Sequence, residues 1–287
     1  MTILCGTDFT PAAAEAVRLA SGFASATHEE LLLAHALGDA AADLRKKLGE
    51  QLEAEARTLV ERGLSSRCAL AQGAIAEELV RLARESAASL VVLGALGRRA
   101  GSSWKLGSTA DRVAQACHAP LLVVRAAAPR EEWLAGQSTL SVAVAYEASR
   151  AADAALVWGA ALARVRPIEL VVLHSYGIHE EREKRGVRGP LPIGTADARL
   201  EEPIARELGA RIAGLGLAVE PRLVLRGGLG RAADQLLDMA AQSGAQLVVV
   251  GNHHRRTLER AWKGSVSRAV VELAKCSVAC ISEREAR

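Results

Sequence analysis

The chain has 287 residues, which is long for one hydrophobic core and enough for two domains of ordinary size. Half of the residues are hydrophobic but only 3% are aromatic, a composition typical of helices packed closely on a sheet rich in Val and Leu. The 36 basic and 33 acidic residues leave a net charge of +3, which argues against a nucleic-acid-binding protein, because such proteins gather Lys and Arg into a patch or stripe.

Short apolar runs alternate with helical stretches along the first part of the chain. Strands are expected at 2–7, 30–36, 66–71, 89–94 and 120–125, and helices at 11–26, 40–62, 74–87 and 107–117. Thr10 before Pro11 is typical of an N-cap followed by proline at the first helical position. The apolar runs at 31–33 and 90–93 are continuous rather than alternating, so these strands should be buried on both faces. This order predicts a parallel sheet with helices on both sides.

The second half of the chain repeats the first. Thr10 aligns with Ser149 at a separation of 139 positions, whereas Gly94 aligns with Gly251 at a separation of 157. The longer separation places extra residues of the second half at 177–194, a charged segment rich in Gly and Pro that we expect to be a mobile loop.

Two homologous domains are therefore expected, at 1–126 and 139–287, joined by a linker at 127–138. Each should be an α/β, Rossmann-like domain with a five-stranded parallel sheet. With the strand order 3-2-1-4-5, the winding reverses between the first and fourth strands, where such sheets bind ligands. The last strands of both halves, at 121–124 and 278–281, are apolar and need to be covered, which the two halves can do for each other in an intrachain pseudo-dimer.

The residues that follow the first and fourth strands are Asp8 and Gly94, so both should face the same crevice. Gly94 begins a glycine-rich segment that ends at the start of the next helix, where free N–H groups and the helix dipole favour an anion. The residues that this segment offers to phosphate are Gly94, Gly97, Arg98, Gly107, Ser108 and Thr109, with Arg99 and Lys105 nearby. Taken singly, Gly94 could end a strand and Ser108 could cap a helix. Their combination at the switch point favours a phosphate site.

The spacing Gly94-x2-Gly97-x9-Gly107-Ser108 resembles the ATP-binding pattern of the universal stress protein family. Residues 7–10 look like that family's first-strand signature, 33–35 like its second-strand Leu-x-His, and 119–124 like its final strand. The resemblance covers nearly the whole chain, once per domain. It implies two tandem domains of the adenine nucleotide alpha hydrolase-like fold, and a nucleotide-dependent stress-response or regulatory protein that binds ATP, with or without Mg²⁺.

The resemblance also implies a role for each candidate residue. Asp8 would contact the adenine or nucleoside side of ATP, and the backbone of Ala36 would meet the adenine edge. The ribose and phosphates would be surrounded by Gly94, Gly97, Gly107, Ser108 and Thr109. Asp8 could instead accept local N–H bonds in a turn, although its position favours the ligand role. We expect His35, inside an apolar strand, to be a buried, hydrogen-bonded structural residue rather than a catalytic one.

The second domain departs from the pattern. His254 stands where the first domain has Gly97, and Glu147 where it has Asp8. A bulky side chain would crowd a loop that needs close backbone approach, and the longer Glu would reposition the carboxylate. The positive cluster at 253–256 could hold phosphate through its side chains or lie in a solvated loop. We expect a degenerate or altered second nucleotide site.

Two other functions compete with ATP binding alone. The sequence lacks the glycine motifs of dinucleotide-binding folds and P-loops and the nucleophile elbow, and no catalytic or metal-binding residue is assigned. Slow ATP hydrolysis, or phosphoryl transfer to Ser108 or Thr109, remains open because some relatives are thought to do it. An interaction scaffold without nucleotide is the other alternative, and the intact glycine motif of the first domain argues against it.

Five cysteines without a C-x-x-C pair indicate buried, reduced thiols. A metal site formed by Cys276, Cys280 and a histidine would lack the paired spacing of zinc motifs. No charged n-region precedes a hydrophobic stretch, and no apolar run approaches the roughly 20 residues that span a bilayer. A cytoplasmic protein without membrane or nucleic-acid partners is expected. Its expected partners are an adenine nucleotide and an unidentified protein, and homodimerisation stays open.

Overall fold

The structure is a computed structural model that describes residues 1–38, 41–96, 106–189, 197–228, 230–252 and 265–283. Its first half contains β1 (Thr2–Gly6), α1 (Pro11–Thr27), β2 (Glu30–Leu37), α2 (Ala42–Glu61), β3 (Ser66–Gln72), α3 (Ile75–Glu85), β4 (Ala88–Gly94), α4 (Ser108–Ala116) and β5 (Leu121–Val124). The second half contains β6 (Leu140–Ala145), α6 (Arg150–Ala161), η1 (Leu162–Arg164), β7 (Ile168–Gly177), α7 (Ile178–Arg185), α8 (Ala198–Ala213), β8 (Arg222–Gly228), α9 (Ala232–Gln242), β9 (Leu247–Asn252), α11 (Val266–Leu273) and β10 (Ser277–Ser282). Helix α5 (Ala128–Leu134) lies between the halves.

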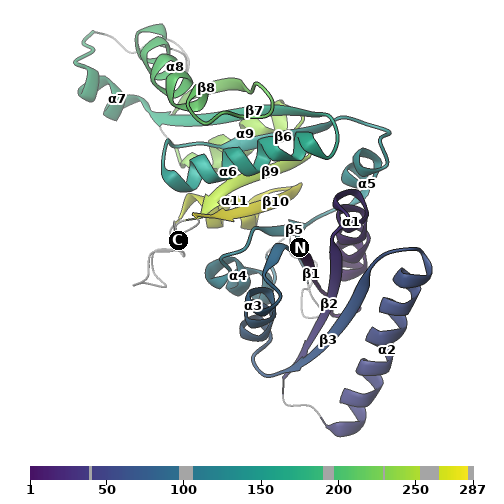
Figure 1. The fold of residues 1–287 in the computed structure, drawn as a ribbon. Coiled ribbons are helices and arrows are strands. Elements are labelled where there is room, and N and C mark those ends of the chain that lie inside the picture. Colours follow the sequence, from purple (N-terminus) through teal and green to yellow (C-terminus); the bar gives the residue numbers. More distant parts are fainter. Residues whose placement is uncertain (39–40, 97–105, 190–196, 229, 253–264, 284–287) are drawn as a thin grey trace.

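All strands belong to one ten-stranded sheet in the order β3-β2-β1-β4-β5-β10-β9-β6-β7-β8 (Figure 1). Each half has the predicted order 3-2-1-4-5 and is parallel throughout. The halves join where β5 and β10 pair antiparallel, so the last strands cover each other as expected. The fold prediction is confirmed, and in each half the winding reverses between the first and fourth strands.

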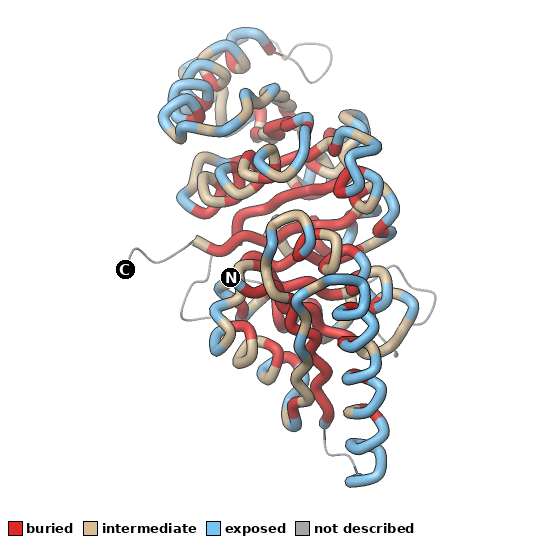
Figure 2. Tube along the Cα trace, turned by 45° about the vertical axis from the view of Figure 1, so that its right-hand side comes forward, coloured by how far each residue is buried: buried red, intermediate tan, exposed pale blue. Residues whose placement is uncertain are grey.

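Helices cover both faces of the sheet, and the strands in its middle are buried, whereas the edge strands β3 and β8 are partly exposed (Figure 2). One core cluster packs α1, α2, α5, α6 and α8 against the sheet, and the other packs α3, α4, α9 and α11 against the opposite face. Neighbouring residues of a strand alternate between the two clusters: Ile3 and Cys5 belong to the first and Leu4 to the second. This double burial explains the continuous apolar runs, because both faces of each strand need hydrophobic side chains.

The local sequence sets the start of α1 as predicted. Thr10 is the N-cap, and its hydroxyl accepts the backbone N–H of Ala13 at 3.3 Å. Pro11 follows at the first helical position, where its missing N–H costs no hydrogen bond. Ser149 has the same role at the start of α6, where it accepts the N–H of Ala152 at 3.1 Å.

The expectation of a mobile loop at 177–194 is wrong for residues 178–185, which form α7. Two glutamates lie in the first turn of α7 and three basic residues in its last turn, which suits the helix dipole. Gly186 then ends the helix with φ 65°. Arg185 also forms a two-bond ion pair with Glu207 of α8, at 2.8 Å for both bonds. The composition of this segment did not predict α7, because an ion pair with α8 helps to stabilise the helix.

Helix α5 occupies the segment expected to be a linker, and it is built into the core. Trp133 is fully buried and donates from Nε1 to the carbonyl oxygen of Pro167 at 2.9 Å. Arg130 is 2% exposed and donates to the carbonyl oxygens of Gln246 and Arg125 at 2.7 and 2.9 Å. Burial lowers the pKa of the Arg130 guanidinium, and these bonds to main-chain oxygens from both halves satisfy part of its donors. The connection is therefore a packed element.

All five cysteines are free, in agreement with the sequence analysis, and three of them are buried. Burial raises the pKa of the Cys280 thiol to about 12 and raises that of Cys5 far above its usual range. Within the described ranges, no helix combines the length and apolar character that crossing a bilayer requires.

We expect Cys5 and Cys280 to resist alkylation by iodoacetamide at pH 8 in the native protein. The thiolate is the reactive form, and each pKa unit of increase lowers its population about tenfold, so labelling should be at least about a hundredfold slower than in urea. Peptide mass spectrometry after timed labelling measures each site. Cys68, which is partly exposed on β3, provides the internal control and should be labelled first. Equal labelling of Cys280 and Cys68 would contradict the burial.

Candidate functional site

Asp8 follows β1 and organises the turn into α1. Its Oδ1 accepts the backbone N–H of Thr10 at 3.1 Å and the hydroxyl of the same residue at 2.6 Å. These are the local turn bonds that the sequence analysis gave as the alternative role of Asp8. They also hold the carboxylate at the carboxyl end of β1, beside the N-terminus of α1. This position of Asp8 is compatible both with the turn role and with the predicted ligand role.

The turn after β1 contains a strained residue that the sequence analysis missed. Phe9 has φ 62°, in the left-handed region that costs a non-glycine residue about 1 kcal/mol or more. Its ring lies 4.9 Å from the ring of His35. Nδ1 of His35 is 2.6 Å from the carbonyl oxygen of Thr7, which fixes the turn to β2. His35 is thus buried and hydrogen-bonded, as expected.

The second half repeats this turn. Ala148 has φ 59°, and Nδ1 of His174 is 2.7 Å from the carbonyl oxygen of Tyr146. Glu147 accepts the hydroxyl of Ser149 at 2.5 Å, just as Asp8 accepts that of Thr10. The aligned positions of the repeat could have indicated a shared turn, but no residue type there signals a positive φ.

Gly94, at the end of β4, lies against the first turn of α1. A Cβ on Gly94 would be 2.9 Å from the carbonyl oxygen of Ala12 and 3.0 Å from its carbonyl carbon. The glycine therefore permits close packing between the strand and the helix, a reason independent of any ligand. This contact brings the end of β4 and the turn that carries Asp8 together, as the topology predicted.

The end of β4 and the start of α4 lie side by side. The N–H of Gly107 donates to the carbonyl oxygen of Ala95 at 2.8 Å. Gly107 is also the N-cap of α4, and as a glycine it has no side chain to accept a capping bond. Ser108 is exposed and Thr109 half-buried in the first turn. The first amides of α4 thus lie next to the end of β4, where a helix N-terminus attracts an anion.

Ala36 lies in β2, one residue before the end of that strand. The pairing of β1 with β2 ends at Gly6 and Ala34, and the carbonyl oxygen of Ala34 accepts the N–H of Thr7 at 2.9 Å. In a parallel ladder, residues two apart direct their N–H and C=O to the same neighbour. The backbone polar groups of Ala36 therefore point toward the side of β1, beyond its last paired residue.

Two predicted site residues, Gly97 and Arg98, lie outside the described residues, as does His254 of the second half. The structure thus brings Asp8, Gly94 and Gly107 to one end of the sheet, with Ser108 and Thr109 in the adjoining turn of α4 and Ala36 on the neighbouring strand. In the part of the chain that the structure covers, no three His, Cys, Asp or Glu side chains form a group able to hold a metal ion.

The corresponding helix of the second half has a different N-terminus. Ser265 is the N-cap of α11, and its hydroxyl accepts the N–H of Arg268 at 3.1 Å. Ser265 aligns with Ser108, which is the first helical residue of α4 rather than its cap. In the second half a side chain of the protein itself therefore satisfies an amide of the first turn, whereas glycine caps α4.

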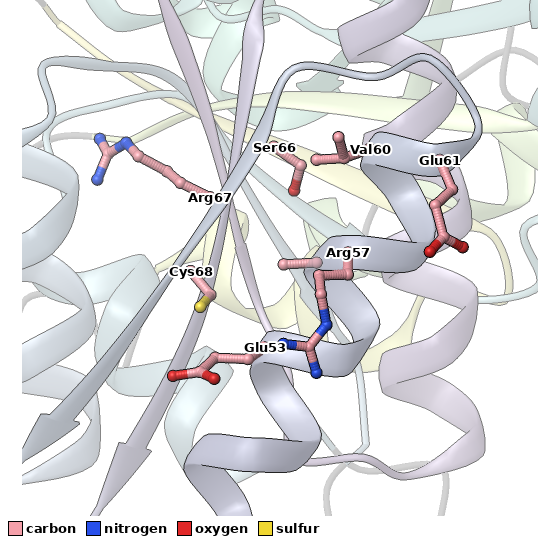
Figure 3. Close-up of a pocket in the computed structure, with 8 residues that line it drawn as sticks. Glu53, Arg57, Val60, Glu61, Ser66, Arg67 and Cys68 are labelled. Carbon is pink, nitrogen blue, oxygen red and sulfur yellow. The ribbon is translucent and has the colours of Figure 1, made fainter.

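A separate hollow of about 480 Å³ lies between α2 and β3, at the outer edge of the sheet (Figure 3). Its lining combines charged side chains, among them Glu53 and Arg57, with Cys68 and the apolar surface of α2. Among the residues that the structure describes, none of the predicted site residues lines it. Strand β2 lies between β3 and β1, so the hollow is not part of the candidate site.

Comparisons with known proteins agree with this architecture. The model of the universal stress protein family matches residues 1–125 and 140–282. Universal stress proteins of Mycobacterium bovis and Mycobacterium tuberculosis are each 29% identical over 207 residues, which is 72% of this chain and 62% of the relative. The chain thus aligns with less than two thirds of the length of these curated relatives.

Solved structures show the same fold over the whole chain. A universal stress protein from Archaeoglobus fulgidus has a TM-score of 0.72 at 16% identity, and the match covers 99% of this chain and 98% of that one. A functionally unknown protein from Pseudomonas aeruginosa has a TM-score of 0.70 at 15% identity, with 98% and 92% covered. Because the family model matches both halves of the sequence, this chain belongs to the universal stress protein family.

Proposed function

We propose that the first half of the chain binds ATP at the carboxyl ends of β1 and β4, and that the protein acts as a nucleotide-dependent stress-response or regulatory module. The observation that carries the proposal is the backbone hydrogen bond from Gly107 to Ala95, which sets the glycine-capped N-terminus of α4 beside the end of β4. Phosphates of ATP would accept hydrogen bonds from these amides and from the hydroxyls of Ser108 and Thr109.

The remaining contacts follow from the same arrangement. Asp8 would meet the nucleoside, and the backbone of Ala36 would meet the adenine edge, since both lie at the end of the sheet where β1 stops. Gly97 and Arg98 would complete the phosphate site from the loop. The domain at 1–126 would thus hold the nucleotide, the segment at 127–138 would connect it, and the domain at 139–287 would carry an altered site. Free thiols support a reducing compartment such as the cytoplasm.

The self-capped helix of the second half favours one nucleotide per chain. Ser265 already accepts the N–H of Arg268, so an anion at α11 would compete with a bond that the protein makes itself. The N-cap of α4 is Gly107, which has no side chain that a nucleotide would need to displace. We therefore expect isothermal titration calorimetry with ATP to give one site per chain, and acid extraction of the purified protein to release adenine nucleotide.

We expect the double variant Ser108→Ala/Thr109→Val to bind ATP about tenfold more weakly, since it removes hydroxyl donors worth about 1 kcal/mol or more. Gly97→His, which copies the second half, should weaken binding by at least as much, because a side chain would crowd the backbone near the phosphates. Calorimetry measures both dissociation constants. Ser265→Ala is the matched control in the second half and should leave ATP affinity unchanged.

The outcome also separates the competing functions. Two equal sites, or unchanged affinity in Gly97→His, would contradict the phosphate site in the first half. Absence of binding would favour an interaction scaffold. Phosphate release above background from the same preparation, lost in the Ser108→Ala/Thr109→Val variant, would identify a slow ATPase.

A further inference from the structure

The two halves meet around a local two-fold axis. In the antiparallel ladder of β5 and β10, Leu122 pairs with Ala279, and these residues hold corresponding positions in the two halves, 157 apart in the chain. Around such an axis, each interface residue near the axis faces its own counterpart. If two copies of one half met here, such a residue would face a copy of itself. The chemistry of counterparts therefore reveals which pairing of halves the interface favours.

Asp111 and Arg268 are counterparts of opposite charge. They have the same separation in the chain as Leu122 and Ala279, and they lie on α4 and α11. Arg268 donates from Nε to Oδ1 of Asp111 at 3.0 Å and from Nη2 to Oδ2 at 3.4 Å, with both side chains about one quarter exposed. Two first halves would bring two carboxylates together at this point, and two second halves would bring two guanidinium groups together.

A second pair of counterparts differs in hydrogen bonding. The hydroxyl of Ser277 accepts the N–H of Arg125 at 2.8 Å and donates to the carbonyl oxygen of Arg125 at 3.0 Å. The counterpart of Ser277 is Pro120, which has no hydroxyl. If two first halves met, both bonds would be lost, and the polar backbone groups of residue 125 would lose these partners.

A third pair of counterparts, Asn252 and Ala95, also favours the pairing of unlike halves. The side-chain amide of Asn252, 3% exposed, donates to the carbonyl oxygen of Ala114 at 2.7 Å. Its counterpart is Ala95, which has no amide to offer. Three independent positions on the interface thus favour unlike halves over two first halves, and the guanidinium pair disfavours two second halves.

We propose that the α4–β5 face of the first half is specific for a face of the second-half type, with the chain's own second half as its occupant. The ion pair between Asp111 and Arg268 discriminates against like pairings by charge repulsion, and the hydrogen bonds of Ser277 and Asn252 add to the preference. Pairing of two first halves is disfavoured at this face, so an association between chains at this face would have to join a first half to a second half. The inference concerns the interface alone and is independent of nucleotide binding.

The test is hydrogen exchange of the full chain, read by mass spectrometry in β5 and β10. Asp111→Arg and Arg268→Asp each place like charges at the axis, as the two homotypic pairings would. Asp111→Asn and Arg268→Gln remove the attraction without adding repulsion. The charge-swapped double variant Asp111→Arg/Arg268→Asp restores opposite charges in reversed positions.

Hydrogen exchange in β5 and β10 should be at least about tenfold faster than in the wild type for the like-charge variants and about threefold faster for the neutral ones. In the charge-swapped double variant it should return to within about threefold of the wild type. Exchange in peptides of β2 and β7, remote from the axis, should change much less than exchange in β5 and β10, which would report that the halves remain folded. Equal effects of like-charge and neutral variants would overturn the proposal, because repulsion would then be absent. If the charge-swapped double variant did not recover protection from hydrogen exchange, the proposal would be overturned as well.

Discussion

Gly251→Ala is expected to lower the free energy of unfolding by about 3 kcal/mol or more, the upper part of the range for overpacked cores. A Cβ on Gly251 would lie 2.6 Å from the carbonyl carbon of Ala151, 2.7 Å from its oxygen and 2.8 Å from the nitrogen of Ala152. These are backbone atoms in the first turn of α6, so no side chain can rotate away. The whole helix must shift from β9, and its buried contacts weaken. Urea denaturation followed by circular dichroism measures the loss.

Two glycines provide the comparison. Gly94→Ala makes the same contact in the first half but with a nearest distance of 2.9 Å, so a loss of about 1–2 kcal/mol is expected. Gly209→Ala lies inside α8, where an added Cβ has no atom within 4 Å. There the substitution should stabilise the protein by up to about 1 kcal/mol, since alanine is the better helix former. If Gly251→Ala were as stable as Gly209→Ala, the close approach of α6 and β9 would be disproved.

The same glycines show what the sequence can and cannot determine. The repeat aligned Gly94 with Gly251, and the alternation of elements predicted the strand order that brings Asp8 and Gly94 to one end of the sheet. These inferences succeeded because topology rules allow few arrangements of alternating strands and helices. The reason for the glycine could not be predicted, because a ligand and a closely packed helix require the same absence of a side chain.

Elements stabilised by distant partners were the ones that escaped prediction. The charged composition of α7 suggested a loop, yet Arg185 is held by Glu207, 22 residues away in the chain. The positive φ of Phe9 is supported by a turn tied to β2 through His35, which no local pattern encodes. In the candidate site, the residues at 8, 94 and 107 could be placed from topology, whereas the glycine cap of α4 and the serine cap of α11 required coordinates.

Helix α5 joins the halves through more than its covalent connection. Trp133 packs its ring 5.9 Å from that of Phe23 in α1, at an interplanar angle of 61°, while its indole N–H donates to the carbonyl oxygen of Pro167 just before β7. One side chain therefore contacts a helix of the first half and a loop of the second. Together with the β5–β10 ladder, this contact makes the stability of each half depend on the other.

We therefore expect Trp133→Ala to lower the free energy of unfolding by about 4 kcal/mol, within the usual range for a fully buried tryptophan. Trp133→Phe keeps most of the ring but loses the indole donor, and a loss of about 1–2 kcal/mol should follow because the carbonyl of Pro167 loses its partner. Urea denaturation followed by far-ultraviolet circular dichroism gives these values without depending on tryptophan fluorescence. Trp158→Ala, at a partly buried position on α6, is the matched control and should cost less. If Trp133→Ala cost no more than Trp158→Ala, α5 would be a passive connection, and the coupling of the halves would depend on the sheet alone.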